Sequence, residues 1–209
     1  YLRGGAALAR SLREPLPRSG APLPELLATN FDRALPVSYT TTGPGYLAYI
    51  PGGGLLHAAV ADLIADAINR FVGLWRAAPG LVQLESNVIA WLCEIVGLPA
   101  GSGGVLTSGG SLANFSATVA ARHRLGERFA DGTIYTSTQA HHSVLRAAIL
   151  AGFPAAQVRA VPVDAQQRIC LERLAEAIAA DRAAGLRPCM LVASAGTTNT
   201  GAVDDLEGM

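Results

Sequence analysis

The feature that most constrains this chain is a regular exchange of short apolar runs and longer helical segments after Gly101. The short runs are strand candidates: GVLT (104–107), TIYTS (133–137), VRAVPV (158–163) and CMLVASA (189–195). Between them, apolar residues recur at helical spacing over 111–125, 142–152 and 171–184. Strands and helices that alternate in this way predict an α/β fold, with a largely parallel sheet and crossover helices.

The part of the chain before Gly101 has a different organisation. Residues 1–54 are rich in Pro and Gly, with one helical stretch near 24–29, and GPGYLAYIPGGG (43–54) predicts a loop. Amphipathic helices are then expected from Leu55 and over 81–96, joined at a Pro79-Gly80 corner as an αα-hairpin. We therefore expect an N-terminal extended and helical segment, residues 1–75, followed by the first part of a larger domain, residues 76–209.

Charge and hydropathy exclude several classes of partner. The 16 basic residues balance the 16 acidic ones, so the chain lacks the positive surplus that nucleic acid binding requires. The longest apolar helical stretch, 55–75, is interrupted by Asp62, Asp66, Asn69 and Arg70, whereas a membrane span needs about 20 mostly apolar residues. We expect no nucleic acid partner and no membrane partner.

Two amino-acid types limit the chemistry. Cys93, Cys170 and Cys189 are far apart and have no zinc-ligand spacing, which favours a reducing cytoplasm and neither a disulfide framework nor a metal site. All 16 basic residues are arginine. Because the chain has no lysine, none of its side chains can form a Schiff base with a carbonyl cofactor.

Small and polar residues follow the first strand candidate, in TSGGSLAN (107–114). In α/β sheets, ligands bind beyond the carboxyl ends of the strands. Gly109 and Gly110 let the backbone approach an anion, and the helix N-terminus offers unpaired N–H groups. Ser108 and Ser111 add hydroxyl donors, and either can cap the helix. The turn predicts a phosphate-binding site, although an ordinary tight turn with a Ser cap has the same residues.

Two further turns share this small, polar character. In STQAHHSV (137–144), we expect the adjacent histidines to point in different directions, so that at most one faces a pocket. Such an imidazole can stack on a flat ring and exchange protons near neutral pH, or it can simply be solvated. In SAGTTNTGAVDD (194–205), small residues suit close packing against a ligand, and Asp204 or Asp205 is expected to cap a following helix.

The three turns, in this order and spacing, resemble those of the group II pyridoxal-phosphate-dependent amino-acid decarboxylases, the family of the aromatic-L-amino-acid and glutamate decarboxylases. SGGSLAN is similar to the family's phosphate-binding turn, and GTTNTGAVD to its Gly-Thr-Thr-x-x-Gly-x-x-Asp stretch. QAHHSV is similar to Gln-Ala-His-Ser-Ser-Val, with His142 in place of a serine. The resemblance runs from about Gly43 to Asp205 and includes YLAYIPGGG and LWRAAPGLVQLESNVIAWLCEIVGLP.

This resemblance implies the large domain of a fold-type-I (aspartate-aminotransferase-like) enzyme, incomplete in this chain, with pyridoxal 5′-phosphate as cofactor. It implies that Gly109, Gly110 and Ser111 hold the phosphate. His141, the expected catalytic residue, would stack on the pyridine ring, and Thr198 would lie near the ring's hydroxyl edge.

The resemblance also implies residues of the substrate pocket. Tyr49, Ile50 and Pro51 match a loop that borders the substrate site in relatives. Phe71 and Leu74 match the region that, in family dimers, enters the partner's pocket, although the residue types differ from those of the aromatic-specific members. A homodimer is therefore expected.

The function implied is decarboxylation of an L-amino acid to an amine and CO2. The family's pyridine-binding aspartate and its Schiff-base lysine would follow Met209, so we expect this chain to be an N-terminal portion that is inactive alone. Tyr49 and Phe71 permit an aromatic substrate, while glutamate, histidine and diamino acids stay open.

Other functions are compatible with the same turns. A cysteine desulfurase or a sphingoid-phosphate lyase also has a small-residue phosphate turn and a stacking histidine, but the QAHHSV and GTTNTGA turns favour a decarboxylase. A non-catalytic scaffold of the same fold is a further alternative. A dinucleotide dehydrogenase is disfavoured because the chain lacks a GxGxxG turn.

Overall fold

The computed structural model describes residues 4–46 and 54–209. The chain forms two compact units, Tyr1–Ile68 and Asn69–Met209, which are described separately. The predicted domain boundary near residue 75 stays a prediction. Tyr49, Ile50 and Pro51, predicted to border a substrate site, lie outside the described residues.

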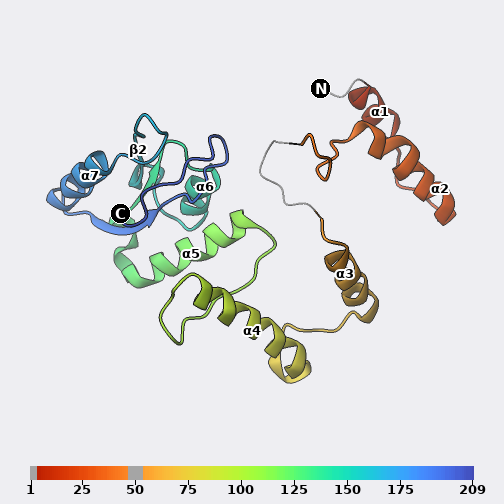
Figure 1. Cartoon of the computed structure of the whole chain (residues 1–209), viewed down its shortest axis with the longest axis horizontal. Helices are drawn as coiled ribbons and strands as arrows, with labels where there is room; N and C mark the ends of the chain where they lie inside the picture. The colour runs from red at the N-terminus through yellow and green to blue at the C-terminus, as the bar shows by residue number, and fades with distance from the viewer. Residues whose placement is uncertain (1–3, 47–53) are drawn as a thin grey trace. The chain divides into compact units, whose positions relative to one another are not determined.

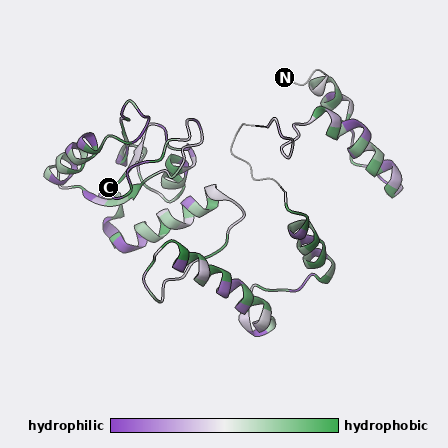
Figure 2. Ribbon diagram, viewed as in Figure 1, coloured by the Kyte–Doolittle hydropathy of each residue, from purple (hydrophilic) through white to green (hydrophobic). Residues whose placement is uncertain are grey.

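The described part of the first unit is helical. Its elements are α1 (Gly5–Ser11), α2 (Leu23–Ala28), the π-helix η1 (Thr29–Ala34), the 3-10 helix η2 (Leu35–Val37) and α3 (Leu56–Ile68). The helices predicted near 24–29 and from Leu55 are therefore confirmed. Helix α3 is largely hydrophobic in Figure 2, and Leu56, Leu63 and Ile64 on it are exposed. The unit therefore presents apolar surface that it does not bury itself.

The second unit begins with η3 (Trp75–Ala77) and α4 (Pro79–Ile95). Pro79 is the first residue of α4, where a missing N–H costs nothing, so the Pro79-Gly80 pair begins a helix and is not a corner between two helices. Helix α4 ends at Ile95, and Gly97, two residues later, has a φ of 73°, which suits glycine. Since α3 and α4 belong to different units, the αα-hairpin stays a prediction.

A three-stranded parallel sheet forms the core of this unit. The remaining elements are α5 (Gly110–Leu125), η4 (Gly126–Asp131), β1 (Gly132–Ser137), α6 (Ser143–Leu150), η5 (Ala155–Gln157), β2 (Val158–Val161), α7 (Leu171–Ala183) and β3 (Arg187–Val192). The strand order is β2-β1-β3, and both pairs are parallel. The predicted α/β fold with a parallel sheet is confirmed.

Strand β1 is covered on both faces. Ile134 packs with Ala148 and Phe153 beneath α5 and α6, while the next residue, Tyr135, packs with Leu174 beneath α7. Figure 1 shows α6 and α7 flanking the strands. The chain moves from β1 to β2 through α6, and back past β1 to β3 through α7. Because both crossovers are expected to be right-handed, this reversal puts their helices on opposite faces of the sheet.

Two strand predictions need correction. Residues 104–107 (GVLT) form no strand, and Val105 and Leu106 are 66% and 53% exposed. A strand needs a neighbour for its backbone hydrogen bonds, and the described residues provide none for this run. The predicted strand 189–195 instead spans Arg187–Val192. It ends early because the backbone N–H and C=O of Ser194 bond to Asp204.

A buried charged cluster fastens α7 to the sheet. The Tyr135 hydroxyl donates to Asp181 Oδ2 at 2.6 Å, and the Arg159 guanidinium donates to both Asp181 oxygens, at distances from 2.6 to 3.1 Å. The side chains of Arg159 and Asp181 are 30% and 9% exposed. Hydrogen bonds from Arg159 hold the pKa of Asp181 below its usual range, and burial raises the pKa of Tyr135 to about 12.

We expect Asp181→Ala to lower the free energy of unfolding by ~3 kcal/mol, because it leaves Arg159 and Tyr135 without their shared acceptor. Glu176→Ala is the matched control on the same helix, since Glu176 forms only an exposed ion pair with Arg173. That control should cost less than about 0.5 kcal/mol. Urea denaturation of both variants measures the difference, and equal midpoints would contradict the prediction.

The same cluster predicts a pH dependence. Because the native pKa of Asp181 is depressed, its contribution to stability is present above the unfolded pKa of about 4 and is lost as the pH falls through the native pKa. Asp181→Ala should therefore show a weaker loss of stability in acid than the unmodified chain. Denaturation midpoints between neutral pH and about pH 3 test this.

Candidate functional site

The three predicted turns leave the strands or enter the helices at one edge of the sheet. Strands β1 and β3 are parallel neighbours, so the segments after Ser137 and after Val192 leave from the same side. The chain after β1 turns toward β2, whereas β3 lies on the opposite side of β1. In α/β sheets, ligands usually bind at the carboxyl ends of the strands where the direction of the connections reverses in this way.

Helix α5 begins at the first of these turns without a side-chain cap. Gly109 is its N-cap residue, and no side-chain hydrogen bond caps it. The Thr107 hydroxyl donates to the Gly109 carbonyl oxygen at 3.0 Å, which fixes the turn from the other side. The prediction that Ser108 or Ser111 caps α5 is therefore wrong. The first N–H groups of α5 are therefore available to donate a hydrogen bond to another partner.

The two glycines of this turn leave space for a ligand. Gly109 has an extended backbone, with φ of 164°, which any residue can adopt. A Cβ at Gly109 or Gly110 would meet no atom within 4 Å. The two glycines therefore leave the backbone open to a ligand. They lie at the N-terminus of a 16-residue helix, and this terminus carries partial positive charge. The turn fits a phosphate group.

The His141 turn is joined to the N-terminal part of α5 by hydrogen bonds. Asn114 Nδ2 donates to Ser143 Oγ at 2.9 Å, and Ser143 Oγ lies 2.8 Å from His141 Nδ1. Ser143 is 3% exposed, whereas the His141 ring is exposed. These contacts place His141 on the same side of the sheet as the start of α5.

The two adjacent histidines do not diverge as expected. The His141 and His142 rings lie against each other, with centroids 4.0 Å apart and planes tilted by 42°. Charge on His141 is the main reason that the pKa of His142 is lowered from its usual value, and partial desolvation adds to the effect. The His142 ring therefore packs against the His141 ring, and its pKa depends on the charge of that ring.

In the third turn, the threonines differ. Thr197 is buried, and its backbone N–H donates to the Ala202 carbonyl oxygen at 2.9 Å, while its hydroxyl lies 2.5 Å from that of Thr200. Thr198 is exposed beside it. Thr197 therefore holds the turn together, which leaves the side chain of Thr198 accessible to a ligand.

Asp204 fixes this turn from within the protein. It is buried, and its carboxylate accepts the backbone N–H groups of Ser194 and Ile169, each at 2.7 Å. A helix-capping role for Asp204 is therefore wrong. Asp205 makes the cap-like contact instead, because its Oδ1 accepts the N–H of Gly208 at 3.1 Å.

Sequence reasoning missed the residues that hold the turns in place. Asn114, Ser143 and Asp204 have these roles. No spacing rule identifies them, because Asn114 lies 29 residues from Ser143 and Asp204 lies 35 residues from Ile169. The structure shows Phe71 and Leu74 as exposed side chains, and their predicted role at a dimer partner's pocket stays a prediction.

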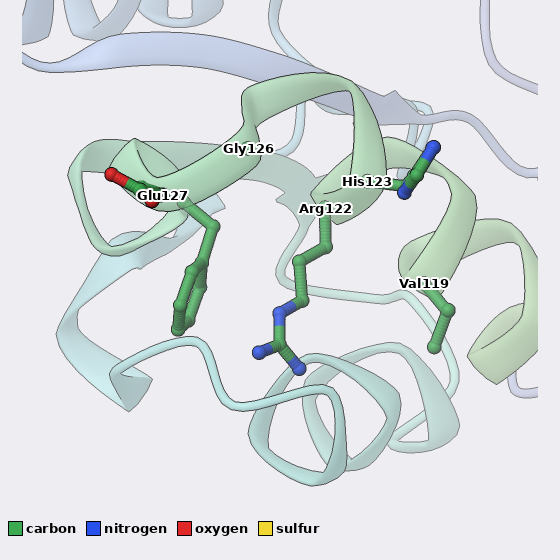
Figure 3. Close-up of a pocket in the computed structure, with 6 residues that line it drawn as sticks. Val119, Arg122, His123, Gly126 and Glu127 are labelled. Carbon is green, nitrogen blue, oxygen red and sulfur yellow. The ribbon is translucent and has the colours of Figure 1, made fainter.

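A separate hollow lies at the other end of α5. Val119, Arg122, His123, Gly126, Glu127 and Phe129 line a space of about 460 Å³ (Figure 3). Arg122 lies 4.1 Å from the centre of the Phe129 ring and donates to the Ala151 carbonyl oxygen at 2.7 Å. These contacts hold the Arg122 guanidinium against the Phe129 ring and the end of α6. The hollow is distant from the three turns, since α5 is ~24 Å long.

Comparison with known families identifies the chain. The model described as the pyridoxal-dependent decarboxylase conserved domain matches residues 8–209. The chain belongs to the pyridoxal-dependent decarboxylase family. It is 36% identical to an aromatic-L-amino-acid decarboxylase of Bacillus atrophaeus over 95% of its own length and 42% of the relative. It is 31% identical to an L-2,4-diaminobutyrate decarboxylase of Rhizobium meliloti (strain 1021), over 92% of the chain and 39% of that relative.

Solved structures of decarboxylases share its fold. The crystal structure of Oryza sativa TDC with PLP and tryptamine matches with a TM-score of 0.86 and 30% identity, over 97% of this chain and 45% of that one. The fold is thus part of the fold-type-I architecture, as predicted. The chain spans about two fifths of the length of the curated relatives named above. Pyridoxal 5′-phosphate is the cofactor of the family.

Within residues 4–46 and 54–209, no group of His, Cys, Asp and Glu side chains is arranged to hold a metal ion. None of the helices described there is long and apolar enough to cross a membrane.

We expect Gly110→Val to weaken pyridoxal 5′-phosphate binding about tenfold or more, because the new side chain would project into the space before the α5 N–H groups. Gly103→Val is the matched control, since a Cβ there also meets no atom within 4 Å. Titrating the cofactor and following its absorbance measures both dissociation constants. Equal weakening by the two variants would contradict a phosphate site at α5.

Proposed function

We propose that the protein containing this chain uses pyridoxal 5′-phosphate to decarboxylate an L-amino acid to an amine and CO2. The main support is the hydrogen-bonded connection from Asn114 through Ser143 to His141. It brings an open helix N-terminus and an exposed imidazole to one side of the sheet, as a phosphorylated aromatic cofactor requires. Membership of the decarboxylase family supports the reaction type.

The chain's own residues would bind and orient the cofactor. Gly109, Gly110 and Ser111 would hold its phosphate through backbone N–H groups and a hydroxyl, with the dipole of α5 balancing the negative charge. The His141 ring would lie flat against the pyridine, and the exposed Thr198 would lie near its hydroxyl edge. When bound, the cofactor supplies the electron sink that the loss of CO2 needs.

Orientation is the contribution of this part of the protein to the rate. Holding the phosphate at one end and the ring face at the other restricts the bound group to one position. Fixing reacting groups in a productive geometry lowers an activation barrier by up to several kcal/mol. His141 is thus proposed to act as the catalytic residue of this chain, in contact with the cofactor.

A small L-amino acid is the proposed substrate. The relatives named above are decarboxylases of aromatic amino acids and of L-2,4-diaminobutyrate, so the family spans apolar and charged side chains. Tyr49, Ile50 and Pro51 are proposed to border the substrate. A panel of L-amino acids assayed for amine release by the whole protein identifies the one it prefers.

We further propose that the whole protein is a cytoplasmic homodimer, with Phe71 and Leu74 near the partner's pocket. Exposed apolar side chains on α4 of the same unit, such as Trp91 and Ile95, support a covered surface. Sedimentation of the whole protein should give twice the monomer mass, and Leu74→Asp should lower the association constant. A monomer at micromolar concentration would contradict the dimer.

The alternatives differ in product. A cysteine desulfurase or a sphingoid-phosphate lyase would release sulfur or an aldehyde, whereas a decarboxylase releases an amine and CO2. The family match favours the decarboxylase. A scaffold of the same fold would bind the cofactor without turnover.

We expect the isolated 209-residue chain to release no CO2 from any L-amino acid, because it has no lysine to bond to the cofactor. The whole protein should release equal amounts of amine and CO2, and His141→Ala in it should lower kcat at least about tenfold by loosening the cofactor. Labelled CO2 and amine are measured together. Turnover by the isolated chain, or an unchanged kcat in His141→Ala, would contradict these roles.

A further inference from the structure

The atoms around His141 determine which of its nitrogens carries the proton. We infer that Asn114 and Ser143 are positioning residues that fix His141 as the tautomer protonated on Nε2. The inference deepens the proposed function, on which it rests, because it defines what the imidazole presents to the cofactor and substrate. The backbone N–H of Ser143 and the side-chain amide nitrogen of Asn114 can donate hydrogen bonds but cannot accept them.

The backbone of Ser143 sets the first constraint. Its N–H lies 3.3 Å from His141 Nδ1 and satisfies the geometry of a hydrogen bond. A backbone N–H only donates, so Nδ1 must accept and cannot carry a proton of its own. A neutral imidazole has one proton, which is therefore on Nε2.

The Ser143 hydroxyl adds a second donor to the same nitrogen. Asn114 Nδ2 is 2.9 Å from Ser143 Oγ, and an amide nitrogen also only donates. The hydroxyl oxygen thus accepts from Asn114 with one of its lone pairs. Because the backbone N–H already requires Nδ1 to be an acceptor, the hydroxyl proton points toward His141 Nδ1, 2.8 Å away. The direction of donation runs from Asn114 through Ser143 to His141, in agreement with the backbone N–H.

Burial protects the hydrogen bonds on the Nδ1 side of the His141 ring. Ser143 is buried and Asn114 is half-buried, so water does not readily replace either partner. No hydrogen bond to His141 Nε2 is present within the described residues, and the ring is exposed. The protein therefore holds the Nδ1 edge and leaves the Nε2–H edge as a donor toward whatever binds at the turn.

The consequence is a fixed ring orientation as well as a fixed tautomer. Two donors converging on Nδ1 oppose rotation of the imidazole about its bond to Cβ. A ring that stacks on a flat cofactor needs such support, because a group placed about 1 Å away from its productive position loses much of its effect. Asn114 has this role although it lies on α5, 27 residues before His141.

Nuclear magnetic resonance of the 15N-histidine-labelled 209-residue chain tests the tautomer directly. The chain has four histidines, His57, His123, His141 and His142, so the loss of one signal in His141→Gln assigns it. Spectra at about pH 9, where imidazoles are neutral, distinguish a protonated nitrogen from an accepting one. We expect His141 to be protonated on Nε2, to a greater extent than the exposed His57.

The decisive variant is Asn114→Asp. A carboxylate has nearly the shape of the amide but accepts the Ser143 hydroxyl proton, so the Ser143 oxygen becomes an acceptor toward Nδ1. Aspartate also has nearly the size of asparagine and the position is only half-buried, so the fold should persist. The ratio of Nε2–H to Nδ1–H tautomer should fall by about tenfold, the effect of one hydrogen bond. Ser116→Ala, whose hydroxyl donates only to the Leu112 carbonyl oxygen, should leave it unchanged.

Ser143→Ala provides a second variant that removes a buried hydroxyl without adding volume. The backbone N–H remains, so the ratio should fall less than in Asn114→Asp. A proton on Nδ1 in the unmodified chain would overturn the inference. So would an identical His141 spectrum in the unmodified chain and in Asn114→Asp.

Cofactor titration separates this inference from the proposed function. If the tautomer responds as expected but Gly110→Val and Gly103→Val bind pyridoxal 5′-phosphate equally, the phosphate site fails and the positioning role stands. If Gly110 is needed for binding but the tautomer does not respond to Asn114→Asp, the positioning role fails alone. In the whole protein, Asn114→Asp should lower kcat severalfold with little change in KM, since it alters ring orientation and not substrate contacts.

Discussion

The structure depends on the burial of β1 between two layers of helices. All six of its residues are buried, and its neighbours β2 and β3 lie on opposite sides of it. Because a central parallel strand must be covered on both faces, α5 and α6 pack on one side and α7 on the other. This arrangement directs the segments after β1 and β3 to one edge. The candidate site forms at that edge, because the sheet brings its side chains together from segments distant in sequence.

Side chains that would not touch a cofactor position those that would. Asp204 binds two backbone N–H groups from segments 25 residues apart in sequence, Ile169 and Ser194, and so closes the turn that presents Thr198. Asn114 and Ser143 do the same for His141. In each case a buried side chain, Asp204 or Ser143, bonds to more than one partner, which makes the turn rigid. Rigid support of this kind is what a site acting by orientation requires.

Polar groups on the two faces of the sheet serve different purposes. On the α7 face, Tyr135, Arg159 and Asp181 satisfy one another and stabilise the packing of that helix. On the α5 and α6 face, a Cβ at Gly109 would meet no atom within 4 Å, and no hydrogen bond to His141 Nε2 is present within the described residues. Unused donors beside fully satisfied neighbours are expected at a binding site, because the ligand completes them. The family match agrees with this division.

The sequence alone determined the alternation of strands and helices, the three small-residue turns and the family, because periodicity and short motifs are local properties. It also indicated Gly109, Gly110 and Ser111 as a phosphate site, and the open space at both glycines agrees. It failed for GVLT (104–107), since four apolar residues resemble a strand whether or not a partner exists. Only the tertiary structure decided that α5 has no side-chain cap, that the two histidine rings touch, and that Asn114 and Asp204 hold the turns. Those features depend on contacts between residues distant in sequence, which only the folded chain brings together.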